Sequence, residues 1–143
     1  MSNVEDEKFA LAKIKKVVGD KGWLADSADI EPYLHDWLKI LEGSCQMVVR
    51  PDTTEQVARV VRICHDAEIP ITPQGGNTGM VGGSVPFGGI VLATDRLNNI
   101  RELDADNATL IVEAGCLLKD VQAAATNAGF LFPLTLASEG SCS

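Results

Sequence analysis

A glycine-rich run in the middle of the chain carries the residue types best suited to chemistry. Residues 73–84 read Pro-Gln-Gly-Gly-Asn-Thr-Gly-Met-Val-Gly-Gly-Ser, and seven of the chain's 13 glycines fall between Gly75 and Gly89. Because glycine reaches positive φ at little steric cost, such a loop can curl tightly and present several backbone N–H groups to one anion. Each N–H that donates to a charged oxygen contributes roughly 1.5–3 kcal/mol net. The run therefore predicts a phosphate- or pyrophosphate-binding loop that needs no lysine.

Two better-known phosphate loops are excluded by inspection. The P-loop ends in Gly-Lys-Ser/Thr, yet no lysine lies between Lys39 and Lys119. The fingerprint Gly-x-Gly-x-x-Gly opens a helix, whereas Gly76, Gly79 and Gly82 are three positions apart and precede an apolar, strand-like stretch. The plain alternative is a surface loop without a ligand, but long glycine-rich loops in compact domains are uncommon and usually functional.

Four stretches of the chain, in this order and spacing, resemble FAD-linked oxidases of the vanillyl-alcohol oxidase and p-cresol methylhydroxylase (PCMH) type. The glycine run, extended to Pro86, resembles that family's flavin loop, and Val-Glu-Ala-Gly-Cys at 112–116 resembles its Ala-Gly turn before a helix. Residues 48–57 resemble its first strand and helix, and residues 132–142, Phe-Pro-Leu-Thr-Leu-Ala-Ser-Glu-Gly-Ser-Cys, resemble its second flavin-contacting segment. The likeness is closest to the D-2-hydroxyglutarate dehydrogenase branch, with D-lactate dehydrogenases and the glycolate oxidase D subunit as near relatives.

The resemblance implies an α+β fold, the first subdomain of a PCMH-type FAD-binding domain, in which helices flank a small mixed sheet. The expected domain covers residues 45–143 and follows an N-terminal helical segment over residues 1–44. In the family the second flavin segment continues into an Ile-Gly-Gly-Asn stretch, whereas this sequence stops at Ser143. We therefore expect the N-terminal part of a longer enzyme, truncated at the C-terminal end of the domain.

By the same resemblance, the complete enzyme is an FAD-dependent dehydrogenase that oxidises a D-2-hydroxy acid, D-2-hydroxyglutarate above all. It would transfer a hydride from the substrate's C2 to FAD and pass the electrons to another acceptor. The family's substrate arginines, metal-binding histidines and catalytic base lie beyond the present residues, so we assign no catalytic and no metal residue and expect no activity from this chain alone. Two alternatives stay open: D-lactate or glycolate as substrate, or a non-catalytic phosphate-binding or interaction module.

The resemblance also implies the residues that contact FAD. The amides of residues 75–79 would hold the pyrophosphate, and Gly140 and Ser141 would approach the cofactor from the second flavin segment. The expected set is Pro73, Gln74, Gly75, Gly76, Asn77, Thr78, Gly79, Met80, Gly83, Ser84, Pro133, Gly140 and Ser141.

Four members of this set have a second interpretation. Asn77 and Thr78 offer short polar side chains to the phosphate oxygens, but they could instead only stabilise the turn. Met80 and Pro133 would pack near the flavin, or either could belong to the hydrophobic core.

The composition limits the partners of the protein. A formal net charge of −8 and a pI near 4.6 argue against nucleic acid or an anionic membrane surface. No apolar run approaches the ~20 residues that span a bilayer. Because residues 1–8 are acidic and lack both a signal-peptide core and an Arg-rich transit pattern, we expect a cytoplasmic protein. The expected partners are a small 2-hydroxy acid and an electron acceptor, with a homodimer as one option for assembly.

Cysteine and histidine give no sign of a metal site. The four cysteines lie far apart without a Cys-x-x-Cys pair, and the only histidines are His35 and His65. His65 follows the helical pattern as a surface residue, and His35 precedes Asp36, but neighbours in sequence need not face each other. We expect no catalytic role for either histidine.

The hydrophobic pattern places the glycine run between two strands. Residues 20–44 give a weak signal, and Trp23, Tyr33 and Trp37 are expected to pack that segment onto the body. Predicted helices cover 4–18, 53–67 and 117–128, and predicted strands cover 46–50, 69–72, 90–94, 100–103 and 109–113. This order is typical of an α+β arrangement and not of a doubly wound sheet.

Overall fold

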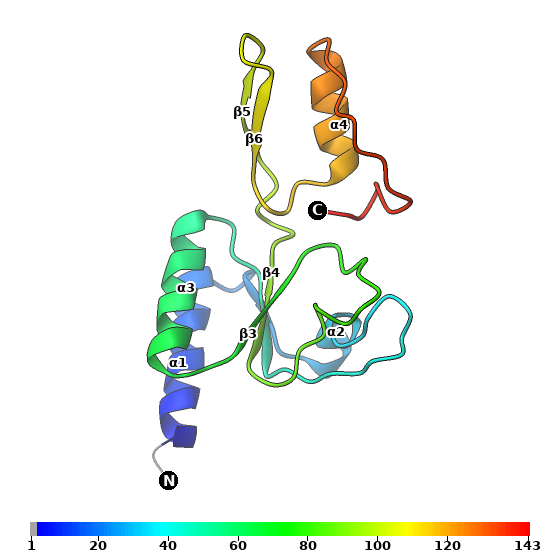
Figure 1. Ribbon diagram of the computed structural model, residues 1–143. Helices are drawn as coiled ribbons and strands as arrows, with labels where there is room; N and C mark the ends of the chain where they lie inside the picture. The colour runs from blue at the N-terminus through cyan, green and yellow to red at the C-terminus, as the bar shows by residue number, and fades with distance from the viewer. Residues whose placement is uncertain (1–2) are drawn as a thin grey trace.

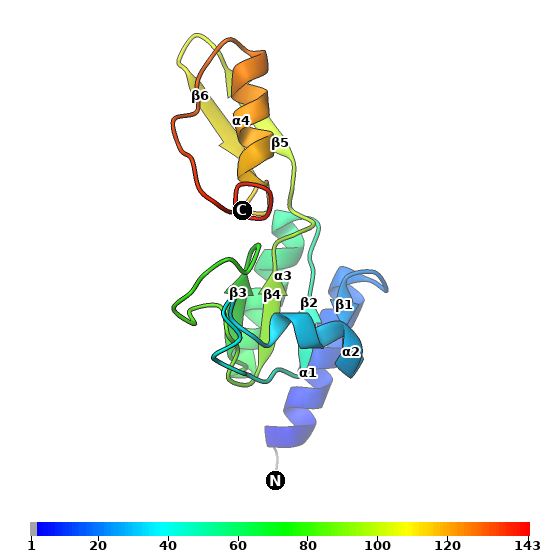
Figure 2. The ribbon, with the colours of Figure 1, turned by 90° about the vertical axis from the view of Figure 1, so that its right-hand side faces the viewer.

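The computed structural model describes residues 3–143, which form two lobes (Figures 1 and 2). The sheet lobe, residues 3–97, holds a four-stranded sheet with helices on its faces, and the hairpin lobe, residues 98–143, holds a β-hairpin beside one helix. The elements are α1 (Asn3–Val18), β1 (Trp23–Leu24), α2 (Ser27–Ile30), the 3-10 helix η1 (Glu31–Tyr33), β2 (Met47–Val49), α3 (Thr54–Asp66), β3 (Ile71–Gln74), β4 (Ile90–Ala93), β5 (Ile100–Asp104), β6 (Thr109–Val112) and α4 (Leu118–Asn127).

The sheet of the first lobe has the strand order β1-β2-β4-β3. Strands β2 and β3 both run parallel to β4, whereas β1 pairs antiparallel with β2. Helix α3 makes the crossover between β2 and β3, so β2, α3 and β3 form a β-α-β unit. All four residues of the central strand β4 are buried, as expected for a strand covered on both faces.

The core of the sheet lobe has two layers. Helices α1 and α3 cover one face (Figure 1), where Ile14, Val60 and Ile90 are fully buried. On the opposite face Val48 and Val91 pack against a smaller group of partly buried residues, Leu24, Ile30, Tyr33 and Cys45. Strand alternation explains this division, because neighbours in a strand point to opposite faces.

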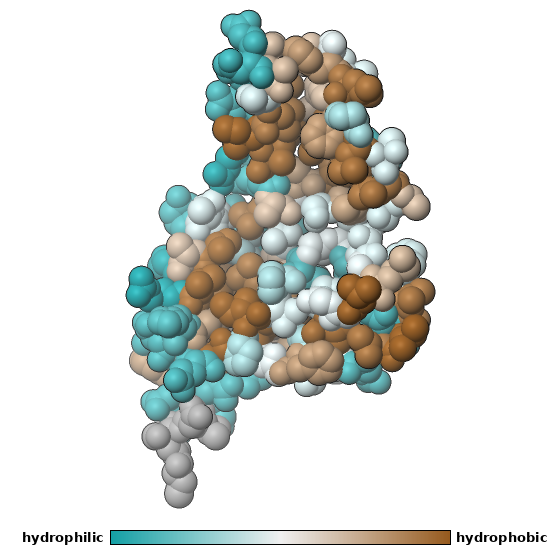
Figure 3. All heavy atoms as spheres, in the orientation of Figure 1, coloured by the Kyte–Doolittle hydropathy of each residue, from teal (hydrophilic) through white to brown (hydrophobic). Residues whose placement is uncertain are grey.

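The hairpin lobe buries less apolar surface than the sheet lobe. Strands β5 and β6 pair antiparallel with an irregularity between Ile100 and Glu102, and four of the five β5 residues are exposed. Figure 3 shows apolar surface on this lobe and also on the loops at the right of the sheet lobe. On the hairpin lobe the exposed large apolar residues include Ile111, Phe130, Leu131, Leu134 and Leu136.

The predicted α+β class with a small mixed sheet and flanking helices is confirmed, and most elements lie within two residues of their expected bounds. Strand β3 lies two residues later than predicted, so Pro73 and Gln74 belong to the strand and not to the loop. Proline is tolerated there because β3 is an edge strand. The weak segment 20–44 contains β1, α2 and η1, and Trp37, expected to pack on the body, is 63% exposed.

Candidate cofactor site

The glycine loop, residues 75–89, leaves the carboxyl end of β3 and meets the C-terminal segment of the chain. A Cβ on Gly76 would overlap the carbonyl oxygen of Ser141, and one on Gly75 would strike the side chain of Ser143. The φ of Gly76 is not positive, so its backbone conformation does not require glycine. Glycine is required at this position because another backbone segment approaches it closely. The two segments expected to contact FAD are in direct contact.

A pocket of about 220 Å³ lies where these segments meet. Its lining brings together residues from the glycine loop, from the end of β4, from the Ala-Gly turn before α4 and from the C-terminus: Gly75, Gly76, Asp95, Asn98, Gly115, Leu117, Asp120 and Ser143. Gly115 is itself held close to the carbonyl oxygens of Thr94 and Leu97, and its N–H donates to Leu97 O at 2.7 Å. Two of the four stretches that carry the family resemblance thus line one hollow, together with Ser143, which directly follows a third.

Side chains inside the loop and β3 fix the loop's shape. Gln74 is 3% exposed, and its Nε2 donates to the carbonyl oxygens of Tyr33 and Ser84, both at 3.0 Å. Asn77 adopts φ 51°, a left-handed conformation that asparagine tolerates better than most residues. Its Nδ2 donates to His35 O at 2.8 Å, and its Oδ1 accepts the Ser84 hydroxyl at 2.7 Å. In this arrangement Asn77 and Ser84 stabilise the loop internally.

The pocket is lined by two carboxylates, those of Asp95 and Asp120. Asp95 lines the pocket and forms an ion pair with Arg50, and this hydrogen bond raises the pKa of the Arg50 guanidinium further. No lysine or arginine lines the pocket among the described residues, so an anion there depends on backbone N–H groups. Burial raises the pKa of the Tyr33 hydroxyl and of the Cys45 thiol, which keeps both groups neutral near pH 7.

The remaining expected residues do not line this hollow. Gly79 and Gly83 have open space where a side chain would lie, and Met80 is 63% exposed at the outer part of the loop. Pro133 is exposed and is not among the residues that line the pocket, and Gly140 has open space beside its Cα.

Six lining residues were missing from the expected set: Asp95, Asn98, Gly115, Leu117, Asp120 and Ser143. Gly115 had a usable signal, because it lies in the Ala-Gly turn that resembles the family. Asp95, Leu117 and Asp120 had no such signal in the sequence, because only the fold brings them to the loop.

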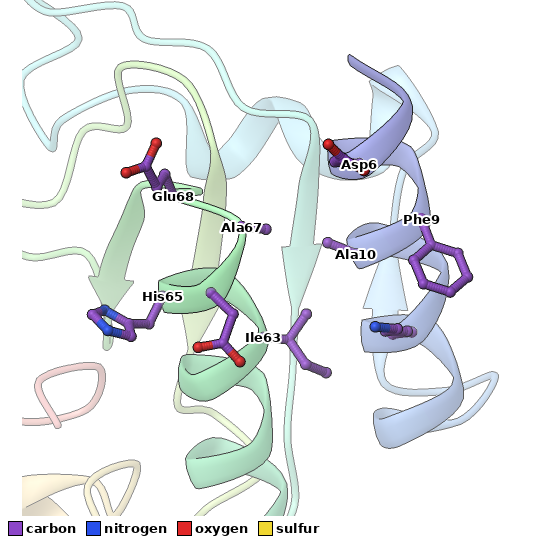
Figure 4. A pocket seen from close by; sticks show the side chains of 9 residues that line it. Asp6, Phe9, Ala10, Ile63, His65, Ala67 and Glu68 are labelled. Atoms are coloured by element: carbon purple, nitrogen blue, oxygen red, sulfur yellow. The ribbon is translucent and has the colours of Figure 1, made fainter. Parts of the chain in front are cut away.

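A larger hollow of about 580 Å³ lies between α1 and the end of α3 (Figure 4). Its lining includes His65, Phe9 and the acidic side chains of Asp6, Asp66 and Glu68. It includes no residue of the glycine loop or of the C-terminal segment, the two parts of the chain expected to contact FAD. We therefore place the candidate cofactor site at the smaller pocket.

Comparison with known proteins identifies the family of the chain. Residues 45–143 match the family described as FAD binding domain. The chain is 39% identical over 133 residues to the mitochondrial D-2-hydroxyglutarate dehydrogenase of Bos taurus, covering 92% of this chain and 24% of that protein. It is 35% identical over 136 residues to a putative mitochondrial D-lactate dehydrogenase of Schizosaccharomyces pombe, covering 90% of this chain and 26% of that protein.

Solved structures show the same fold. A 4-ethylphenol oxidase from Gulosibacter chungangensis superposes with a TM-score of 0.77 at 26% identity, covering 87% of this chain and 25% of that one. A p-cresol methylhydroxylase superposes with a TM-score of 0.76 at 24% identity, covering 88% of this chain and 25% of that one. The predicted PCMH-type fold is thereby confirmed.

The chain belongs to the FAD-binding domain family, and FAD is its cofactor. Gly75 and Gly76 both line the pocket, where they carry no side chain that would fill it. The chain spans about a quarter of the length of the curated relatives it matches.

The predicted cytoplasmic location is wrong. Similar dehydrogenases, including those of Bos taurus and Schizosaccharomyces pombe, are named mitochondrial. The prediction depended on the acidic character of residues 1–8, and charge over so short a stretch is weak evidence for a compartment. Among residues 3–143, no helix combines the length and apolar character needed to cross a bilayer.

Gln74→Leu should destabilise the protein by about 2 kcal/mol, because the carbonyl oxygens of Tyr33 and Ser84 would lose a buried donor. Urea unfolding followed by circular dichroism measures this loss. Gln122→Leu is the matched control, since Gln122 Nε2 also donates to two acceptors, Leu134 O at 2.7 Å and Glu139 Oε1 at 3.3 Å, but at a position that is only half-buried. Equal losses in the two variants would contradict the special role of Gln74.

Proposed function

We propose that residues 45–143 form the FAD-binding, PCMH-type domain of a flavoprotein dehydrogenase, preceded by the N-terminal segment 1–44. We also propose that the whole protein oxidises a D-2-hydroxy acid, with D-2-hydroxyglutarate as the first substrate to test. Identity of 39% to a D-2-hydroxyglutarate dehydrogenase supports this choice. The observation that carries the FAD site is the contact between Gly76 and Ser141, which joins two segments distant in sequence into one hollow.

This geometry supports the proposed FAD contacts. The backbone N–H groups of residues 75–79 would donate to the pyrophosphate, and Gly140 and Ser141 would close the opposite wall. Thr78, Met80, Gly83 and Pro133 are proposed as outer contacts, whereas Pro73, Gln74, Asn77 and Ser84 would support the loop that carries the N–H groups. When bound, FAD accepts a hydride and the electrons leave for a second acceptor.

The decisive experiment uses the complete polypeptide that contains this chain. We expect it to purify with bound flavin and to reduce an artificial dye when given D-2-hydroxyglutarate, but not the L enantiomer. Absence of flavin from well-folded protein, even after incubation with FAD, would reject the proposal. Sedimentation of the same protein tests assembly as a homodimer.

D-lactate is the second candidate substrate, because a relative 35% identical to this chain is named a putative D-lactate dehydrogenase. Dye reduction with D-lactate, glycolate and D-2-hydroxyglutarate at equal concentrations separates the candidates. The substrate with the highest kcat/KM identifies the branch of dehydrogenases to which the whole protein is proposed to belong.

Residues 1–143 by themselves should bind FAD much more weakly than the complete polypeptide and should show no turnover. The chain covers only 24% of the Bos taurus relative, so many of the contacts available to FAD there have no counterpart here. Each missing charged hydrogen bond would cost about 1.5–3 kcal/mol, which amounts to at least tenfold in affinity. Calorimetric titration with FAD and a dye assay measure both properties. Submicromolar stoichiometric binding, or turnover above a free-flavin blank, would contradict this expectation.

A further inference from the structure

We propose that Asp36 is a positioning residue for the FAD pyrophosphate, acting through the segment that holds the glycine loop. This segment, residues 33–44, is called the clamp here. It precedes the part of the chain that matches the FAD-binding family, residues 45–143. The inference rests on the proposed FAD site and adds to it a residue outside that domain.

Asp36 organises a tight turn within the clamp. Its side chain is buried, with 4% exposed, although aspartate is mostly found at the surface. Its Oδ1 accepts hydrogen bonds from the backbone N–H groups of Ile40 and Leu41, both at 2.8 Å. The N–H of Lys39 donates to the Asp36 carbonyl at 2.9 Å, and Lys39 adopts φ 53°. The side-chain Oδ1 and the carbonyl oxygen of Asp36 together close the turn over residues 36–41.

Backbone oxygens of the clamp hold the loop at its start and in its first turn. Tyr33 O accepts Gln74 Nε2 at 3.0 Å, and His35 O accepts Asn77 Nδ2 at 2.8 Å. His35 immediately precedes Asp36, so a shift of the turn moves the acceptor of Asn77 directly. Asn77 follows Gly75 and Gly76, whose N–H groups are proposed to hold the pyrophosphate.

The other end of the clamp holds the far side of the loop. Leu41 packs over Gly82, where no side chain is present to displace it. The N–H of Ser44 donates to Pro86 O at 2.8 Å, and the N–H of Gly43 donates back to Leu34 O at 2.8 Å. Because Leu41 is itself held by Asp36 Oδ1, the carboxylate acts on both ends of the glycine loop.

Asp36 makes no hydrogen bond to the loop itself, so its effect is indirect. The hydrogen bond from the Leu41 backbone, supported by others in the turn, lowers the pKa of the Asp36 carboxyl and keeps it charged at neutral pH. Without the carboxylate, two partly buried N–H groups lose their acceptor and the turn must rearrange. The loop amides proposed to bind the pyrophosphate would then adopt several arrangements, and FAD would bind only one of them.

The test compares Asp36→Ala and Asp36→Asn with a matched control, Asp104→Ala. Asparagine keeps an Oδ1 acceptor and should rescue the turn. Asp104 is a fitting control because its Oδ1 also accepts two backbone N–H groups, from Asp106 and Asn107, but in the turn between β5 and β6. Circular dichroism of each variant confirms that the fold is retained.

Two readouts are measured on each variant: the Kd for FAD of the complete polypeptide, and hydrogen exchange of the amides of residues 75–84. We expect Asp36→Ala to raise the Kd about tenfold or more and to speed exchange in the loop. Asp36→Asn should stay within about threefold of the parent, and Asp104→Ala should change neither readout.

Unchanged loop exchange in Asp36→Ala, or an equal effect of Asp104→Ala, would overturn the positioning role. If the parent protein binds no FAD, the proposed function fails by that result alone. The exchange measurement still decides whether Asp36 orders the loop, so the two failures are distinguishable.

Discussion

Gly76→Val should separate the glycine loop from the C-terminal segment and lower the affinity for FAD about tenfold or more. A Cβ at this position would overlap the carbonyl oxygen of Ser141, and backbone cannot move aside as a flexible side chain can. Overpacking of this kind typically costs about 1–3 kcal/mol, and 1.4 kcal/mol corresponds to a tenfold change in Kd. Flavin content and calorimetric Kd of the complete polypeptide measure the effect.

Gly79→Val tests the folding part of this effect, since Gly79 is itself one of the residues whose amides are proposed to hold the pyrophosphate. Gly79 lies in the same loop with non-positive φ, and a Cβ there would meet no atom within 4 Å. The fold of the ligand-free protein should therefore tolerate valine at this position. If Gly76→Val retains the parent's affinity while Gly79→Val loses it, the loop contacts FAD differently from the arrangement proposed here.

Ile90→Ala should cost about 2–5 kcal/mol of folding free energy, a large part of the 5–15 kcal/mol typical of a whole domain. Ile90 is fully buried in the central strand, between β2 and β3 and beneath the helices α1 and α3. Truncation leaves a cavity that neighbours on both sides of the strand cannot fill without distorting the sheet. Urea unfolding of the variant measures the loss.

Val81→Ala provides the reference for Ile90→Ala. Val81 is 93% exposed, so its truncation should change stability by no more than about 0.5 kcal/mol. A loss below 1 kcal/mol in Ile90→Ala would show that the sheet is not the centre of the core.

Local signals in the sequence predicted the local structure well. The Thr53–Gln56 capping pattern marks the start of α3, where Gln56 N donates to Thr53 Oγ1 at 3.1 Å. Gln56 Oε1 accepts from Asp52 N at 3.0 Å, one residue earlier than in the standard capping box. The hairpin and α4 likewise followed from turn residues and helical spacing.

Contacts between distant residues explain what the sequence did not reveal. Residues 20–44 have little periodicity, and their structure depends on partners such as Gln74 and Pro86 far along the chain. The need for glycine at residue 76 comes from Ser141, so neither local spacing nor the φ preference of glycine could reveal it. Lining residues such as Asp95 and Asp120 reach the pocket only after both lobes have formed.

The edge position of β3 has a consequence for the solubility of the protein. Pro70 O accepts from Ile90 N in β4, and Gln74 O accepts from Thr94 N directly after it. The alternate residues Ile71 and Pro73 therefore direct their backbone groups to the open side of the strand. Proline has no N–H, which leaves Ile71 as the only donor that β3 presents there. A strand from another molecule could form few hydrogen bonds along this edge, so Pro73 protects the sheet against aggregation by strand addition.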